Sequence, residues 1–160
     1  MLIVFSVVSP VLIFIDLEIK RIPNKITLVF VILLIALSVF FPNFDSPISQ
    51  QLQPLLVGLA ISFFYFVLVI ASKGGMGMGD AKLALPLGYL VAYFSWKQAV
   101  VSGIFAFFIG ALYGAGQMLL RGKGRKHAIP FAPFMILGAW LAILAEYATS
   151  ARILEFWTIQ

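Results

Sequence analysis

The chain has 160 residues, of which 62% are hydrophobic and only 11% are charged, with a formal net charge of +5 and a mean hydropathy of +1.08. This composition excludes an ordinary water-soluble domain and is typical of an integral membrane protein, so we expect a lipid bilayer as its partner and no nucleic acid. Because cysteine is absent and His127 is the only histidine, we expect no disulfide, no metal site and no other cofactor.

Hydropathy and helix-breaking residues predict an all-α fold with about six transmembrane helices. At about 20 residues each, the spans take up most of the chain, so we expect one membrane-embedded domain over residues 1–160. The first span is the least sharply bounded, because its strictly apolar run stops at Ile15 whereas Pro23 is the residue that ends a helix. The predicted spans are residues 2–22, 26–41, 54–72, 81–95, 98–120 and 130–148.

The basic residues indicate how these helices are oriented, because Lys and Arg gather in short cytoplasmic loops. Nine of the eleven basic residues fall on one side of the predicted topology, and only Lys97 and Arg152 fall on the other. Both termini are therefore expected outside, with six crossings. Basic residues follow the first apolar run instead of preceding it, which is the reverse of a cleaved signal peptide, so the first span is expected to be retained.

Two aspartates stand out in this apolar sequence. Asp16 follows the run from Leu2 to Ile15, and Asp80 closes the glycine-rich segment 74–80 directly before another apolar run. A carboxylate at the centre of a bilayer costs roughly 2.5 to 3.5 kcal/mol, so acids at membrane depth are functional candidates. In the predicted topology both acids reach the cytoplasmic boundary. We therefore expect the two carboxyl groups to meet there.

Two carboxyl groups at close range can act together as an acid and a base. Mutual repulsion and the desolvating edge of the membrane favour a state in which the pair shares one proton. The ionised partner can then take a proton from a water that attacks a peptide carbonyl, while the protonated partner hydrogen-bonds to the carbonyl oxygen and later helps the amine to leave. The pair thus predicts peptide hydrolysis without a metal or a covalent intermediate.

The glycine-rich segment before Asp80 fits this chemistry for a steric reason. Its glycines, Gly77 and Gly79 among them, permit positive φ and let an extended substrate strand approach the acid closely, so we expect them to bind substrate. A flexible turn between two helices accounts for the same spacing equally well. The segment is not a phosphate-binding loop, because it lacks Gly-Lys-Ser/Thr and no strand precedes it.

Two further charged residues lie beside the acids in the sequence. Lys82 follows Asp80 by two residues and could stabilise an ionised carboxylate, contact substrate or bind a lipid phosphate, although a lysine at the membrane interface needs no such role. Glu18 lies about 200° round a helix from Asp16, so we expect it to face the lipid headgroups.

A pair of small residues in the fifth span bears on assembly. Gly110 and Gly114 form a small-xxx-small pair, which permits close approach of two helices. That approach could take place within the bundle or in a homodimer, and the sequence leaves both alternatives open.

The same acids also allow a different class of function, a small transporter or channel that passes protons or ions. Such a path places its acids near the middle of the membrane, with polar residues leading in from both sides. Here the outer halves of the predicted spans are almost bare of polar groups, which favours the peptidase.

Three segments, in order along the chain, resemble the peptidase core of the type IV prepilin peptidases, which belong to the GxGD membrane aspartyl proteases. They are Asp16 with residues 21–24 (Arg-Ile-Pro-Asn), Gly77 to Leu83, and Ile129 to Phe134. The resemblance implies that Asp16 and Asp80 are catalytic. It also implies that the enzyme removes the short basic leader of prepilins or prepilin-like proteins at the cytoplasmic face of the plasma membrane, typically after a glycine.

The chain departs from this family pattern at several points. Larger members carry a Cys-x-x-Cys zinc region and methylate the new amino terminus, whereas this chain has no cysteine, so we expect a short, peptidase-only form without methyltransferase activity. The usual glycine of the Pro-Phe-Gly-Pro-Phe segment is Ala132 here, which bears on the local backbone geometry. Ile15 precedes Asp16 where presenilin-like proteases have tyrosine, so that branch is disfavoured.

Overall fold

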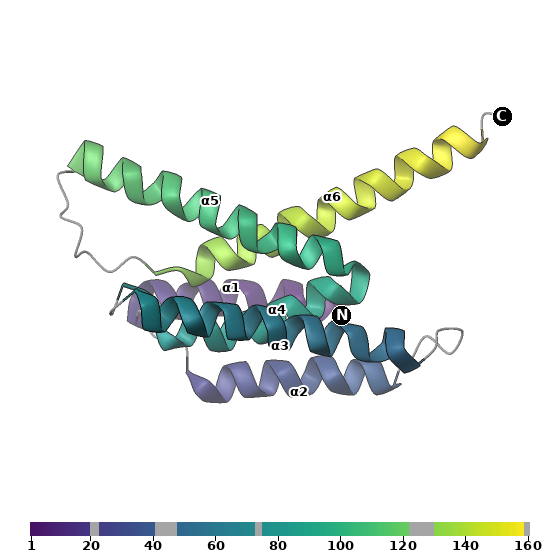
Figure 1. The fold of residues 1–160 in the computed structure, drawn as a ribbon, viewed down its shortest axis with the longest axis horizontal. Helices are drawn as coiled ribbons and strands as arrows, with labels where there is room; N and C mark the ends of the chain where they lie inside the picture. Colours follow the sequence, from purple (N-terminus) through teal and green to yellow (C-terminus); the bar gives the residue numbers. More distant parts are fainter. Residues whose placement is uncertain (20–22, 41–47, 73–74, 122–129, 159–160) are drawn as a thin grey trace.

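The computed structural model describes residues 1–19, 23–40, 48–72, 75–121 and 130–158. Over these ranges the chain forms six helices and no strand, which confirms the predicted all-α class (Figure 1). Arg21, Ile22, Gly74, His127 and Ile129, which the sequence analysis singled out, lie outside the described residues. The helices are α1 (Leu2–Ile19), α2 (Asn24–Phe40), α3 (Ile48–Ala71), α4 (Met78–Phe94), α5 (Trp96–Arg121) and α6 (Ala132–Thr158).

Three helices extend beyond the predicted spans by three residues or more. α3 begins at Ile48 instead of residue 54, α4 begins at Met78 instead of residue 81, and α6 continues to Thr158 instead of ending at residue 148. In each case the extra residues include polar or small side chains next to the apolar stretch. Hydropathy detects the part of a helix that suits lipid, so it stops short where the helix continues with polar residues.

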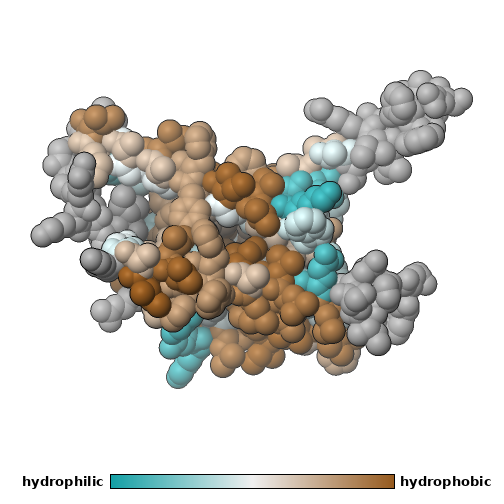
Figure 2. Space-filling model, viewed as in Figure 1, coloured by the Kyte–Doolittle hydropathy of each residue, from teal (hydrophilic) through white to brown (hydrophobic). Residues whose placement is uncertain are grey.

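The helices and the surface both fit a membrane environment. Four of the described helices are long and apolar enough to cross a bilayer, over Leu2–Ile19, Gln51–Ala71, Trp96–Leu119 and Ala132–Thr149. α2 and α4 have 17 residues each, at the short end of what a crossing needs. Hydrophobic side chains cover the middle of the face in Figure 2, with hydrophilic patches toward its ends. The chain is therefore a multi-pass membrane protein, while six crossings with both termini outside stay a prediction.

α4 is the central helix of the bundle. Consecutive helices run in opposite directions, and α5 and α6 cross each other above the layer formed by the other four (Figure 1). α4 packs against α2, α3, α5 and α6, and most of its residues between Asp80 and Ala92 are buried. Because this burial extends over all faces of the stretch, neighbouring helices cover it all round. The surrounding helices thus fix the position of Asp80, in the first turn of α4.

Glycines allow the helices to pack in two close pairs. A Cβ added at Gly58 of α3 would lie 2.8 Å from the backbone oxygen of Leu85 in α4, and one added at Gly138 of α6 would collide with the backbone oxygen of Ser102 in α5. Small residues permit such close approach of helices in a bilayer. We call these contacts the α3–α4 seam and the α5–α6 seam.

Gly110, one of the two glycines of the small-xxx-small pair, packs against neighbours inside this bundle. A Cβ added at Gly110 of α5 would lie 2.9 Å from the ring of Phe131 and 3.3 Å from the ring of Phe134 in the same chain. The lack of a side chain at Gly110 therefore serves packing within the bundle. A homodimer stays a prediction.

Candidate active site

The two aspartates lie at one end of the bundle. The last turn of α1 carries Asp16 and the first turn of α4 carries Asp80, and these two helix ends share one side of the molecule with the start of α6 (Figure 1). Both acids are buried, with exposed fractions of 3% for Asp16 and 7% for Asp80. They are near enough for the charge of Asp16 to act on Asp80. The structure therefore brings the two predicted acids together.

Asp16 reaches across to the beginning of α6. The backbone N–H of Ala132 donates a hydrogen bond to Oδ2 of Asp16 over 3.1 Å. Ala132 is the first residue of α6, so its N–H has no partner within that helix, and a negative charge at this position is favoured by the helix dipole. The alanine in place of the usual glycine thus leaves the backbone contact in place, with its side chain fully buried.

Asp80 caps the helix to which it belongs. The backbone N–H of Gly77 donates to Oδ2 of Asp80 over 3.2 Å, and the N–H of Asp80 donates to the carbonyl of Gly77 over 3.1 Å. Gly77 has φ −79° and ψ 145°, an extended conformation that needs no glycine. Met78 and Gly79 already belong to α4. The flexible segment is therefore shorter than the sequence suggests, because the capping bonds fold its last part into a helix start.

The remaining predicted residues lie around the acids. Lys82 is exposed, and its ammonium group donates to Oδ1 of Asn24 over 2.8 Å, which ties the second turn of α4 to the first turn of α2. Gly79 is half-buried next to Asp80, and Glu18 is exposed on α1. Among the described contacts Lys82 therefore holds a helix end in place, and none joins it to Asp80.

Tyr65 of α3 also belongs to this site, and the sequence analysis missed it. Its exposed fraction is 2%, and its phenol interacts electrostatically with Asp80. The ring stacks on Phe107 with 5.3 Å between centroids and contacts Phe131, the residue before Ala132, at 6.3 Å. Tyr65 thus links the acid of α4 to the segment that supports the acid of α1. The feature of the sequence that could have indicated Tyr65 is its polar hydroxyl group within an otherwise apolar membrane-spanning segment.

The described side chains at this end of the bundle do not form a typical metal-binding site. Within the described ranges, no three side chains of His, Asp or Glu gather where they could hold one ion. The prediction that the protein needs no metal and no other cofactor has no test here and stays a prediction.

Comparison with known proteins places the chain in a family. The model of the type IV leader peptidase family matches residues 3–115, a range that includes Asp16, Asp80 and the glycines between 74 and 79. The chain belongs to this family. The family expected from the three sequence segments is therefore confirmed.

Several curated members of the leader peptidase family are similar to this chain over most of its length. The prepilin leader peptidase/N-methyltransferase of Aeromonas salmonicida (strain A449) is 30% identical over 134 residues, and the protein of the same name from Bacillus subtilis (strain 168) is 32% identical over 129 residues. The matches cover 82% and 81% of this chain but only 44% and 49% of the relatives. The chain thus spans about half the length of these relatives. No solved structure gives a significant match.

Proposed function

We propose that this protein is a membrane aspartyl endopeptidase that removes the basic leader from prepilins or prepilin-like proteins at the cytoplasmic face of the plasma (inner) membrane. The observation that supports the proposal is that Asp16 and Asp80 are both buried at one end of the bundle, near enough to interact electrostatically, in a chain that belongs to the type IV leader peptidase family. We also propose that residues 1–160 act as a single aspartyl peptidase domain.

Asp16 and Asp80 form the acid–base dyad of this proposal. Two negative charges at short range in a poorly solvated site are costly, so the pair holds one proton between its carboxyl groups. The ionised carboxylate takes a proton from a water molecule, whose oxygen attacks the carbon of the scissile peptide bond. The protonated carboxyl group hydrogen-bonds to the carbonyl oxygen, and a proton then passes to the leaving amine as the C–N bond breaks.

Backbone amides orient both carboxylates for this reaction. The N–H groups of Ala132 and Gly77 each bind the Oδ2 atom of one acid. In this proposal the Oδ1 atom of each acid is the one that acts on the water and the substrate. Because the four groups come from the ends of α1, α4 and α6, the dyad is complete only while these three helix ends stay together.

Gly77, Gly79 and Lys82 have supporting roles in this proposal. Both backbone groups of Gly77 already bond to Asp80, so Gly77 orients the acid. Pairing with substrate backbone then falls to Gly79, whose N–H lies in the first turn of α4 and has no helical partner. Lys82 repels a basic leader, so a substrate carbonyl or a lipid phosphate suits its ammonium group better.

The family and the position of the acids give no support to the alternative of a proton or ion transporter. A transport path places its acids near the middle of the membrane, with polar residues leading in from both sides. Here both buried acids lie at the same end of the bundle (Figure 1).

The test is co-expression with prepilins from the same genome, scored by the size of the processed product. Asp16→Asn and Asp80→Asn should each lower the rate of processing roughly 10²- to 10⁴-fold, because each removes one partner of the acid–base pair. Both variants should still insert into the membrane. Glu18→Gln is the matched control, since Glu18 is an exposed acid in the same turn region of α1, and it should process normally.

Two outcomes would contradict the proposal. Processing at the normal rate in either asparagine variant would exclude the dyad. Failure of the unmodified protein to shorten any prepilin of its own genome would exclude the substrate class.

A further inference from the structure

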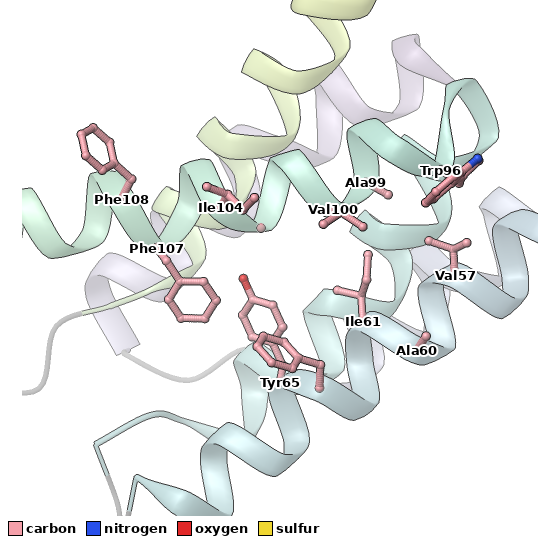
Figure 3. A pocket seen from close by; sticks show the side chains of 12 residues that line it. Val57, Ala60, Ile61, Tyr65, Trp96, Ala99, Val100, Ile104, Phe107 and Phe108 are labelled. Atoms are coloured by element: carbon pink, nitrogen blue, oxygen red, sulfur yellow. The ribbon is translucent and has the colours of Figure 1, made fainter.

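A groove between α3 and α5 begins beside the acid pair and opens toward lipid. It has a volume of about 800 Å³, and its walls are almost entirely apolar. Figure 3 shows Tyr65 and Phe107 next to each other at one end of the groove and Trp96 and Val57 at the other. The ring of Tyr65 also contacts Phe131, the residue before Ala132, whose N–H binds Asp16. Tyr65 therefore borders both the groove and the acid pair.

The groove exists because the two close helix pairs leave a gap between them. α3 packs mainly on α4 and α5 packs mainly on α6, each through a glycine seam, while α3 and α5 have few contacts with each other. Between the seams the side chains of Val100 and Ile104 remain exposed, with 50% and 61% of their surface open. This side of the site is bounded by lipid and not by another helix of the described chain.

The dimensions of the groove suit a helix. Along α5 it runs from Trp96 to Phe108, which at 1.5 Å per residue is about 18 Å, more than half of the hydrocarbon thickness of a bilayer. A peptide segment that enters from lipid has to be helical, because its backbone groups find no other partners there. Apolar side chains of such a helix match the apolar walls formed by α3 and α5.

We propose that the groove between α3 and α5 binds an apolar helical segment of the substrate that enters from the lipid, with the end of that helix at Tyr65. The inference rests on the proposed peptidase function. A helix seated there ends beside Asp80, so the backbone that continues from it can unwind directly in front of the two acids. Substrate recognition then has two parts, the apolar helix in the groove and the cleavage segment at the dyad.

Gly103 of α5 offers a direct way to fill the groove. It lines the groove, and a Cβ added there meets no atom within 4 Å, so a larger side chain enters open space. Gly103→Leu should therefore fold normally and compete with the substrate helix. Gly116→Leu is the matched control, because Gly116 lies on the same helix, has the same free surroundings and does not line the groove.

Two probes separate helix binding from catalysis. One is a prepilin from the same genome with its apolar helix, and the other is a synthetic peptide with only its leader and cleavage site. Gly103→Leu should raise KM for the prepilin about tenfold, the effect of losing one well-packed contact, with kcat unchanged. The same variant should cleave the short peptide like the unmodified protein, and Gly116→Leu should match the unmodified protein on both. An unchanged KM for the prepilin in Gly103→Leu would overturn the groove assignment.

Photocrosslinking identifies what lies in the groove. A benzophenone amino acid at Ile104, in an Asp80→Asn background that keeps the prepilin intact, should form an adduct with the prepilin. The same probe at Leu112, an exposed position of α5 outside the groove, should not. Adducts at Ile104 with lipid alone or with a second copy of this chain would overturn the proposal. If the unmodified protein processes no prepilin, the peptidase proposal fails first, whereas normal processing with no adduct at Ile104 counts against the groove alone.

Discussion

The two sides of α3 are built in opposite ways. On the side of α4, a Cβ added at Gly58 would lie 2.8 Å from the backbone oxygen of Leu85 and 2.9 Å from the backbone nitrogen of Tyr89. On the side of α5, a Cβ added at Gly103 would meet no atom within 4 Å. One side therefore has no room for a single carbon atom, and the other has room for a whole side chain.

This difference shows which helix contacts of this membrane protein are closely packed and which are not. Lipid tails are as apolar as leucine, so helices in a bilayer are held together by tight contact and hydrogen bonds and not by the hydrophobic effect. The tight side of α3 holds α4 and with it Asp80. The open side is the one that a substrate can reach from the lipid. Rigidity and access are thus divided between two faces of one helix.

The largest effect is expected from adding a side chain on the tight side of α3. Gly58→Leu forces a branched side chain into the backbone of α4, so α3 and α4 must separate. We expect loss of the folded protein, seen as aggregation in size-exclusion chromatography after detergent extraction, whereas Gly103→Leu should elute like the unmodified protein. A folded, active Gly58→Leu variant would show that the α3–α4 seam is not tight in solution.

A smaller effect is expected from one added carbon on the facing helix. In Gly88→Ala the new Cβ would lie 3.1 Å from Cα of Gly58 and 3.2 Å from Cδ1 of Ile61, so the seam has to open slightly. Overpacking of this kind costs about 1–3 kcal/mol, which a thermal unfolding series in detergent can detect. Gly116→Ala, whose Cβ meets no atom within 4 Å, is the control and should be neutral or slightly stabilising. Equal losses in both variants would remove the distinction between seam and open surface.

The smallest effect is expected from a hydrogen bond that supplements the packing of α4. The hydroxyl group of Tyr89 in α4 donates to Oγ of Ser38 in α2 over 2.6 Å. Hydrogen bonds between membrane helices contribute about 0.6 kcal/mol on average, so Tyr89→Phe should lower the free energy of unfolding by about that amount. A loss above about 2 kcal/mol, as for a buried group left without its partner, would mean that polar contacts and not glycine packing hold α4 in place.

The sequence predicted the helices and the approach of the two acids but not the hydrogen bonds and packing contacts between helices. Long apolar runs are enough to locate six helices, and an acid such as Asp16 is conspicuous because it is costly in lipid. Nothing local connects Asp16 with the amide of Ala132, because that hydrogen bond forms only when α1 and α6 come together. The groove has the same origin, since it depends on which helices pair through glycine seams.

The apolar character of the chain also explains why the sequence did not indicate which face of each helix packs against its neighbours. In a soluble protein the buried face of a helix is marked by its hydrophobic side, whereas here the lipid-facing side is hydrophobic as well. Phe107 and Phe108 are adjacent and identical in type, yet Phe107 stacks on Tyr65 while Phe108 is 61% exposed. The start of α4 was missed for a different reason, because the capping bonds of Asp80 extend this helix into the glycine segment.

The account depends most on the meeting of Asp16 and Asp80, and the absence of cysteine from the chain makes this directly measurable. A variant with Asp16→Cys and Asp80→Cys should be joined rapidly by a short bifunctional thiol reagent in membranes. The pair of Glu18→Cys and Asp80→Cys should react much more slowly, because Glu18 is exposed two positions along α1. Efficient joining of positions 16 and 80 is the predicted result. Separate labelling of the two thiols from opposite sides of the membrane, with no cross-link between them, would contradict it.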